Sequence, residues 1–244
     1  MIKHYGIHEV NRYINWSYFF HAWGFQPRDM QSPEAKQLLQ EANQMLTLLN
    51  ENFQTHAIFK LAEANSEDND VWIENTRFPF LRQQTAKEGK PYHCLSDFIR
   101  PISQGIKDHI GLFAPTVDAK MEQLYPEDHY QHLLVKTLSD RLAEATAEKL
   151  HETVRKTMWG YAPDEQLSIE QLHNEEFQGI RPAVGYPSLP DQSVIFILDD
   201  ILHLNGIGIE LTPNGAMFPH ASVCGIMLSQ HRVTLPWARS ARSS

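Results

Sequence analysis

The chain of 244 residues carries 21 Lys and Arg against 30 Asp and Glu, and the formal net charge of −9 disfavours nucleic acids and anionic membranes as general partners. Its two cysteines, Cys94 and Cys224, lie far apart without a CxxC spacing, so neither a disulfide framework nor a zinc ribbon is indicated. No apolar run approaches the roughly 20 residues that span a bilayer, and the amino terminus lacks a secretory signal, so we expect a cytoplasmic protein.

The first half of the chain predicts a helix followed by a hairpin. Ser32-Pro33 joins a capping hydroxyl to a proline at the first helical position. The apolar residues that follow share one helical face: Ala35, Leu38, Leu39, Ala42, Met45, Leu46 and Leu49. Residues 57–64 and 70–74 predict two antiparallel strands, with the polar run 65–69 as their turn, and residues 109–116 predict a further strand.

The second half predicts a long helix and a short one. Residues 127–159 contain no Gly or Pro and place apolar residues at helical spacing, which predicts one helix that ends near Gly160. Ser168, followed three residues later by Gln171, predicts a capping box and a helix to about Phe177.

The remaining pattern predicts an α+β fold. Residues 194–201 are apolar and of undecided type, and residues 222–229 predict a buried strand. Helices and strands interleave without a regular β-α-β alternation, and no Gly-x-Gly-x-x-Gly follows a strand. We therefore expect a single α+β domain over residues 1–229 and not a nucleotide-binding doubly wound sheet.

Residues 178–190 present one cation, Arg181, on a stiff loop. Three prolines fix φ and two glycines permit turns or close approach: Pro182, Pro187, Pro190, Gly179 and Gly185. A guanidinium held in this way suits a carboxylate or a phosphate, because its planar fork can donate two parallel hydrogen bonds. The alternative is a structural ion pair with a neighbouring acid.

The same loop resembles a known family. Arg181 to Tyr186 resembles the Arg-x-x-x-Gly-Tyr signature of the reactivation domain of cobalamin-dependent methionine synthase. Further stretches match the family in order: Tyr13-Ile14-Asn15-Trp16, Leu81-Arg82-Gln83-Gln84, Cys94-Leu95-Ser96-Asp97-Phe98, Ser139-Asp140-Arg141-Leu142-Ala143-Glu144-Ala145, Trp159-Gly160-Tyr161-Ala162-Pro163 and Met217-Phe218-Pro219. The resemblance implies a twisted antiparallel sheet with helices packed around it.

The resemblance also implies a site for S-adenosylmethionine. Arg181 would hold the ligand carboxylate, with Ala183, Gly185 and Tyr186 beside it. Glu175 matches a further family position near the site, and Glu144 matches an acidic family position on the long helix; the alternative for each is a solvated helix charge. Methyl transfer from a sulfonium requires alignment and not a base, so the absence of a Ser-His-Asp or paired-carboxylate signature is consistent with this function.

Two positions depart from the family pattern. Asn15 stands where the family typically has an Asp suited to accepting from the adenine amine, so we expect weaker binding. Leu235-Pro236 stand where the family has a Tyr-Tyr pair. The pattern ends after Ser229, and we expect residues 230–244 to form a divergent, flexible tail.

Two other clusters have simpler interpretations. His129, His132 and His151 suggest a metal, but no HExxH or Cys/His cluster supplies further ligands, so we expect no metal site. The aromatic residues at helical spacing are either a ligand platform or core, and core is the commoner outcome: Trp16, Phe19, Phe20 and Trp23.

We therefore expect a module that binds S-adenosylmethionine and supports reductive methylation of cob(II)alamin, as a methyltransferase component and not as a complete methionine synthase. The chain lacks the Asp-x-His-x-x-Gly corrinoid signature, so cobalamin would come from a separate chain that carries the cobalamin-binding methionine synthase modules. A flavodoxin-type protein is a candidate reductant.

Two alternatives remain open. The chain could be a non-catalytic docking protein for a corrinoid protein, having lost S-adenosylmethionine binding through Asn15 and Leu235-Pro236. It could also be a small-molecule-binding domain with no link to a corrinoid.

Overall fold

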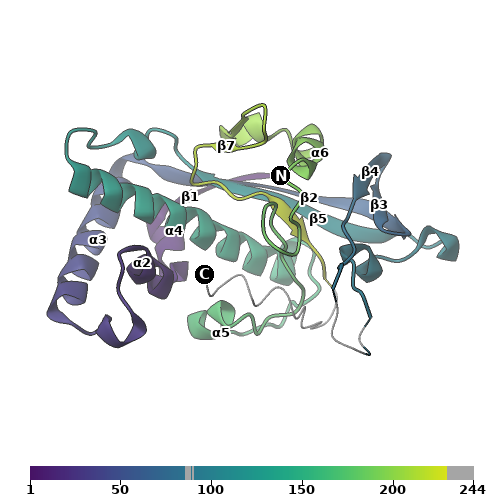
Figure 1. Cartoon of the computed structure of the whole chain (residues 1–244), viewed down its shortest axis with the longest axis horizontal. Helices are drawn as coiled ribbons and strands as arrows, with labels where there is room; N and C mark the ends of the chain where they lie inside the picture. The colour runs from purple at the N-terminus through teal and green to yellow at the C-terminus, as the bar shows by residue number, and fades with distance from the viewer. Residues whose placement is uncertain (86–88, 90, 230–244) are drawn as a thin grey trace.

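The computed structural model describes residues 1–85, 89 and 91–229. A long antiparallel sheet has the strand order β4-β3-β2-β5-β8, and β1 pairs with β2 on the edge that β3 also occupies (Figure 1). Its strands are β1 (Ile2–Gly6), β2 (Gln54–Glu67), β3 (Asp70–Ile73), β4 (Thr76–Pro79), β5 (Asp108–Val117) and β8 (Gly225–Met227). A second, two-stranded sheet pairs β6 (Glu210–Leu211) with β7 (Met217–Phe218).

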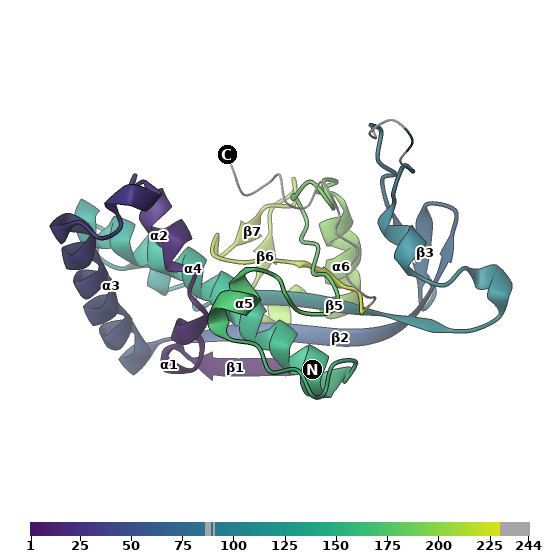
Figure 2. The ribbon, with the colours of Figure 1, turned by 90° about the horizontal axis from the view of Figure 1, so that it is seen from below.

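Helices cover both faces of the long sheet. They are α1 (Ile7–Val10), α2 (Trp16–Ala22), α3 (Pro33–Asn52), α4 (His129–Thr153), α5 (Ile169–His173) and α6 (Val194–Leu202). Side chains alternate along β2, so Ala57 and Phe59 join the core under α3 and α4, while Ile58 joins the core under α6. Figure 2 shows α2 and α3 at one end of the sheet and β3 at the other. The predicted α+β architecture is confirmed.

The two long helices follow their local sequence signals. The Ser32 side chain accepts a hydrogen bond from Ala35 N at 3.1 Å, which confirms the predicted start of α3. The Asp128 side chain caps α4 in the same way, by accepting from Gln131 N. The predicted long helix 127–159 is confirmed as α4 with a π-helical last turn, Val154–Met158.

The predicted hairpin forms, but its turn is shorter than we expected. Strand β2 continues to Glu67, so residues 65–67 belong to the strand and not to the turn. The reason lies elsewhere in the chain: Asn65 Nδ2 donates to the carbonyls of Arg100 and Ile106, and Ser66 Oγ donates to the carbonyl of Ile99. These bonds satisfy the polar side chains inside the structure, so they need not lie in a solvated turn.

Three further expectations are corrected or completed in the second half. The capping box at Ser168 is present, but α5 ends at His173 and not near Phe177, because Glu175 has a left-handed φ of 57°. The undecided stretch 194–201 is the helix α6. The strand expected over 222–229 is regular only at Gly225–Met227 and is flanked by isolated bridges.

The aromatic group is core at its centre. Phe19 and Phe20 are buried, and Trp16 and Trp23 are partly buried against the same cluster. Both cysteines are buried free thiols. Across residues 1–85, 89 and 91–229, no helix combines the length and the apolar character that crossing a bilayer requires. The tail expected at 230–244, including Leu235-Pro236, lies outside the described residues.

Candidate functional site

The loop 178–190 lies along the open edge of β8. Ile180 and Leu228 exchange two backbone hydrogen bonds, of 2.9 and 3.0 Å, and Ile226 N donates to the carbonyl of Pro182 at 2.9 Å. Pro182 therefore uses its carbonyl in the pairing and has no N–H to leave unpaired. The loop extends the sheet as an irregular strand, which fixes the position at which Arg181 leaves the backbone.

Close backbone packing holds this loop in place. Gly225 of β8 lies so near the loop that a Cβ atom there would stand 2.2 Å from the Pro182 oxygen and 2.8 Å from Ala183 Cα. Gly179 has a φ of 88°, and a Cβ atom there would stand 2.6 Å from the Leu228 oxygen. Both contacts require glycine, which makes the loop a tightly docked element.

Arg181 reaches from this loop to helix α4. Its Nη2 donates to Glu148 Oε1 at 2.5 Å, and the side chains of Arg181 and Glu148 are 13% and 14% exposed. Arg181 Nη1 and Glu148 Oε2 are buried without a hydrogen-bond partner. The structural ion pair that the sequence left as an alternative is thus present, and the proposed ligand contact of Arg181 stays a prediction.

Several carboxylates surround this guanidinium. Burial alone would lower the pKa of Arg181, but the nearby charges of Glu148, Glu144 and Glu175 raise it overall, so the side chain stays cationic. The structure therefore brings together Arg181, Glu144 and Glu175, which are distant in sequence.

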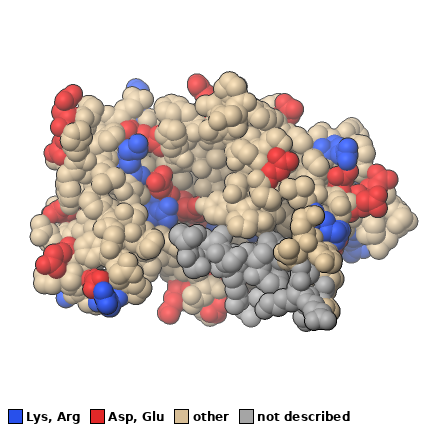
Figure 3. All heavy atoms as spheres, in the orientation of Figure 1, with Lys and Arg blue, Asp and Glu red and all other residues tan. Residues whose placement is uncertain are grey.

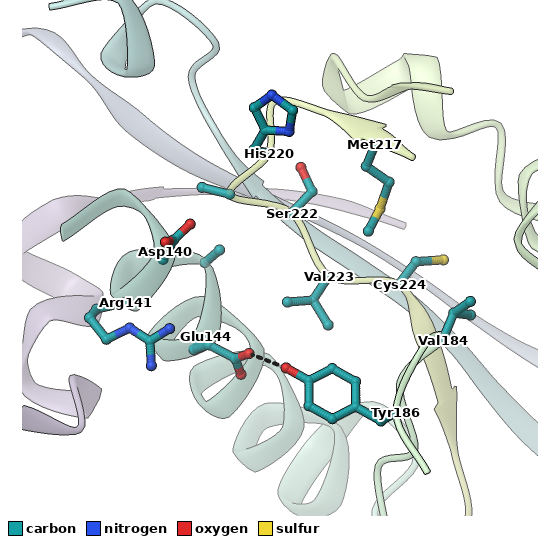
Figure 4. A pocket seen from close by; sticks show the side chains of 12 residues that line it. Asp140, Arg141, Glu144, Val184, Tyr186, Met217, His220, Ser222, Val223 and Cys224 are labelled. Carbon is teal, nitrogen blue, oxygen red and sulfur yellow. Dashed lines mark hydrogen bonds between the residues drawn. The ribbon is translucent and has the colours of Figure 1, made fainter. Parts of the chain in front are cut away.

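Tyr186, at the end of the signature, turns toward α4. Its hydroxyl donates to Glu144 Oε1 at 3.4 Å (Figure 4). The charge of Glu144, together with burial, raises the pKa of Tyr186, so the hydroxyl remains protonated and available as a donor. Glu144 is half-buried and is not a freely solvated helix charge.

A pocket of about 200 Å³ opens beside this pair. One wall is α4, one is the loop and one is the segment 217–224: Asp140, Arg141, Ala143, Glu144, Val184, Tyr186, Met217, His220, Ala221, Ser222, Val223 and Cys224. Of the predicted site residues, Glu144 and Tyr186 line it, whereas Arg181, Ala183 and Gly185 lie outside its lining. The pocket thus adjoins the Arg181 ion pair through Glu144.

The third wall is fixed by a buried acid that sequence reasoning missed. Glu122 accepts hydrogen bonds from the backbone N–H groups of His220, at 3.1 Å, and Ala221, at 2.6 Å. Thr116 Oγ1 and Ser222 Oγ lie 2.7 Å apart. No local signal around Glu122 indicates these bonds, because their partners lie about a hundred residues further along the chain.

The pocket combines acids with one cation. Burial raises the pKa of Asp140, Arg141 lowers it, and Glu122 and Glu144 raise it further. Acidic and basic side chains lie close together over the middle of the face in Figure 3, and no single-sign patch covers the described residues on that face. Such a surface suits a ligand that carries both charges.

Asn15 has a local structural role. Its Oδ1 accepts from Ser17 N at 3.1 Å and so caps α2. Asn15 is not among the residues that line the pocket. An oxygen acceptor has two lone pairs, so this bond leaves one for a ligand, and the expected adenine contact stays a prediction.

Two of the three histidines considered as metal ligands, His132 and His151, have other contacts. His132 Nδ1 lies 2.8 Å from the carbonyl of Leu124, and His151 is buried with its Nε2 3.2 Å from Tyr161 Oη. Within the described residues, no group of three or more His, Cys, Asp or Glu side chains could hold a metal ion.

Comparison with known proteins relates this chain to one described family and to a solved structure. Residues 6–235 match the family described as "Vitamin B12 dependent methionine synthase, activation domain". The chain also resembles the solved structure described as "Crystal Structure of the MetH Reactivation Domain bound to AdoHcy", with 36% sequence identity and a TM-score of 0.91. That match covers 96% of this chain and 79% of the other.

Proposed function

This chain belongs to the family of vitamin B12 dependent methionine synthase activation domains, and from that membership we propose that it binds S-adenosylmethionine and supports reductive methylation of cob(II)alamin on a separate chain. The partner would carry the cobalamin-binding modules of methionine synthase, and a flavodoxin-type protein would supply the electron.

The observation that carries this proposal is the place of Arg181. It stands on a loop docked by backbone hydrogen bonds, next to a pocket that Glu144 and Tyr186 line. The ligand carboxylate would pair with the guanidinium, while the acids of the pocket would favour the ligand's positive charges. The similar solved structure is described as bound to AdoHcy, whose headgroup is also an amino acid.

The pocket sets a limit on how the ligand lies. Its volume of about 200 Å³ is below the roughly 300–1,000 Å³ of typical small-molecule sites, so part of the ligand would lie outside it. Arg181 Nη1 is buried, so carboxylate binding requires a shift of the side chain or of the loop.

When bound, S-adenosylmethionine supplies a methyl group on a sulfonium, and the protein supplies position. Arg181 would fix the amino-acid end, and Tyr186, 48% exposed, would lie at the mouth of the pocket where a corrinoid approaches. The residues of the site would have to orient the methyl group without abstracting a proton.

Calorimetry with S-adenosylmethionine tests binding, and a methyl-transfer assay with a cobalamin-loaded methionine synthase lacking its own activation domain tests function. We expect saturable heat below millimolar ligand and formation of methylcobalamin under reducing conditions. No heat from a folded sample at millimolar ligand would exclude the cofactor role.

A second candidate is a docking protein that has lost the ligand. It is favoured by the Arg181–Glu148 ion pair, which already neutralises the guanidinium, and by Asn15, which replaces a carboxylate. Capture of a cobalamin-binding module in a pull-down, with no uptake of S-adenosylmethionine, would support this candidate over the first.

A further inference from the structure

Glu148 is hydrogen-bonded to the guanidinium that would hold the ligand carboxylate, although no sequence pattern marks Glu148 as a site residue. It lies one helical turn after Glu144 on α4 and faces the loop. Its carboxylate meets Arg181 through one oxygen and one nitrogen only. A full side-on pair would use two nitrogens and both oxygens.

This single contact leaves one hydrogen-bond donor and one acceptor of the ion pair without a partner. Arg181 Nη1 is a donor and Glu148 Oε2 an acceptor, and both are buried. An amino-acid headgroup carries a carboxylate and an ammonium on the same carbon, so it presents an acceptor and a donor at adjacent positions. The two free atoms of this ion pair match that arrangement.

Neighbouring acids are less suited to the ammonium. Glu144 lines the pocket and accepts from Tyr186 Oη, which places it with the part of the ligand inside the pocket. Glu175 acts on Arg181 by charge and has contacts of its own. Glu148 is the acid that hydrogen-bonds to Arg181 among the described residues.

We propose that Glu148 is a specificity-determining residue that accepts a hydrogen bond from the α-ammonium group of the ligand while Arg181 holds its carboxylate. This inference rests on the proposed function. The ion pair then serves as a joint receptor for a zwitterionic headgroup and selects against ligands that lack the amino group.

The test compares two ligands on two proteins by calorimetry: S-adenosylhomocysteine, and its analogue with hydrogen in place of the α-amino group. We expect wild-type protein to bind the amino ligand about tenfold or more tightly, as for loss of a charge-assisted hydrogen bond. Glu148→Gln should lose most of this preference by weakening the amino ligand alone. Glu152→Gln, a half-buried acid on the next turn of α4 that pairs with Tyr13, should keep the wild-type preference.

The outcomes separate the possible failures. If wild type binds neither ligand, the proposed function itself fails. If wild type binds both ligands equally, or if Glu148→Gln weakens both by the same factor, Glu148 only supports Arg181 and the inference is overturned. Should Glu148→Gln not fold, Glu148→Asp takes its place: loss of most of the preference for the amino ligand supports the inference, and an unchanged preference overturns it.

Discussion

Two buried Arg–Glu pairs, one before the loop and one within it, differ in how completely they are bonded. Arg155 is 0% exposed and meets Glu165 side-on, with Nε and Nη2 at 2.6 to 3.0 Å from its oxygens, while its guanidinium lies 4.4 Å from the centre of the Phe177 ring. Arg181 meets Glu148 through one contact. The first pair engages two nitrogens and both carboxylate oxygens and leaves Arg155 Nη1 unpaired, whereas the second leaves a donor of Arg181 and an acceptor of Glu148 unpaired.

The difference indicates which pair can serve a ligand. The Arg155 pair anchors the entry to the loop, because its guanidinium lies over the ring of Phe177, which directly precedes the loop, and His151 packs edge-to-face against the same ring. The Arg181 pair lies further along, where the loop reaches the pocket. The Arg155–Glu165 pair thus holds the backbone that leads to the pair proposed to bind the ligand.

The largest loss of stability is expected from breaking the Arg155–Glu165 pair. Glu165→Ala leaves the fully buried Arg155 cation uncompensated, which should destabilise the protein by about 3–5 kcal/mol. Urea unfolding measures this. A loss below about 1 kcal/mol would mean that Arg155 is solvated in solution and that the contrast between the pairs is wrong.

A smaller effect is expected from displacing the loop. Gly225→Ala places a Cβ atom against Pro182 and Ala183, so we expect a loss of about 1–3 kcal/mol in stability together with weaker ligand binding. Gly206→Ala is the matched control, since its Cβ atom would meet Ile2 Cδ1 at an ordinary 3.5 Å. Equal stability of the two variants would show that the loop is not held by this contact.

The pH dependence of the free energy of unfolding tests the burial of His151 beside Arg155. Burial, and then the charges of Arg155 and Arg181, lower the pKa of His151 well below its ordinary value. The folded state keeps His151 neutral, whereas the unfolded chain binds a proton with a pKa of about 6.5. The free energy of unfolding should therefore fall as the pH drops below about 6.5, by up to about 1.4 kcal/mol per pH unit.

Urea unfolding of wild type and His151→Gln at pH 7.5, 6.5 and 5.5 measures this contribution of His151 to stability. The variant should show a shallower fall with acidification than wild type. Parallel curves would mean that His151 does not titrate differently in the two states.

The smallest effect is expected at Asn15. Asn15→Asp keeps the cap of α2, because both residues cap well, so stability should change by less than about 0.5 kcal/mol. If this position contacts the adenine amine, the restored charge should strengthen S-adenosylmethionine binding by about 1 kcal/mol. Unchanged affinity in calorimetry would place the adenine elsewhere.

Sequence reasoning succeeded where the determining contacts are local. Ser32-Pro33 starts α3 through bonds within one helical turn, and the absence of Gly and Pro from 127–159 allows α4. It failed at residues 65–67. Whether these residues form a strand or a turn depends on hydrogen bonds to the distant carbonyls of Ile99, Arg100 and Ile106.

The residues of the candidate site show the same division between local patterns and distant contacts. The stiffness of the Arg181 loop is a local property of its prolines and glycines, and the family resemblance supplied Glu144 and Tyr186. Glu148 and Glu122 act through partners far along the chain, and neither stands in a pattern that distinguishes it from a surface acid. Distant contacts of this kind require the fold.

The central claim is that Arg181 pairs with the ligand carboxylate, and a calorimetric comparison of S-adenosylhomocysteine with its methyl ester tests it most directly. Wild type should prefer the free acid by about 2 kcal/mol or more, and Arg181→Ala should bind acid and ester equally. If Arg181→Ala keeps the full preference for the acid, another group holds the carboxylate and the account of this site is wrong.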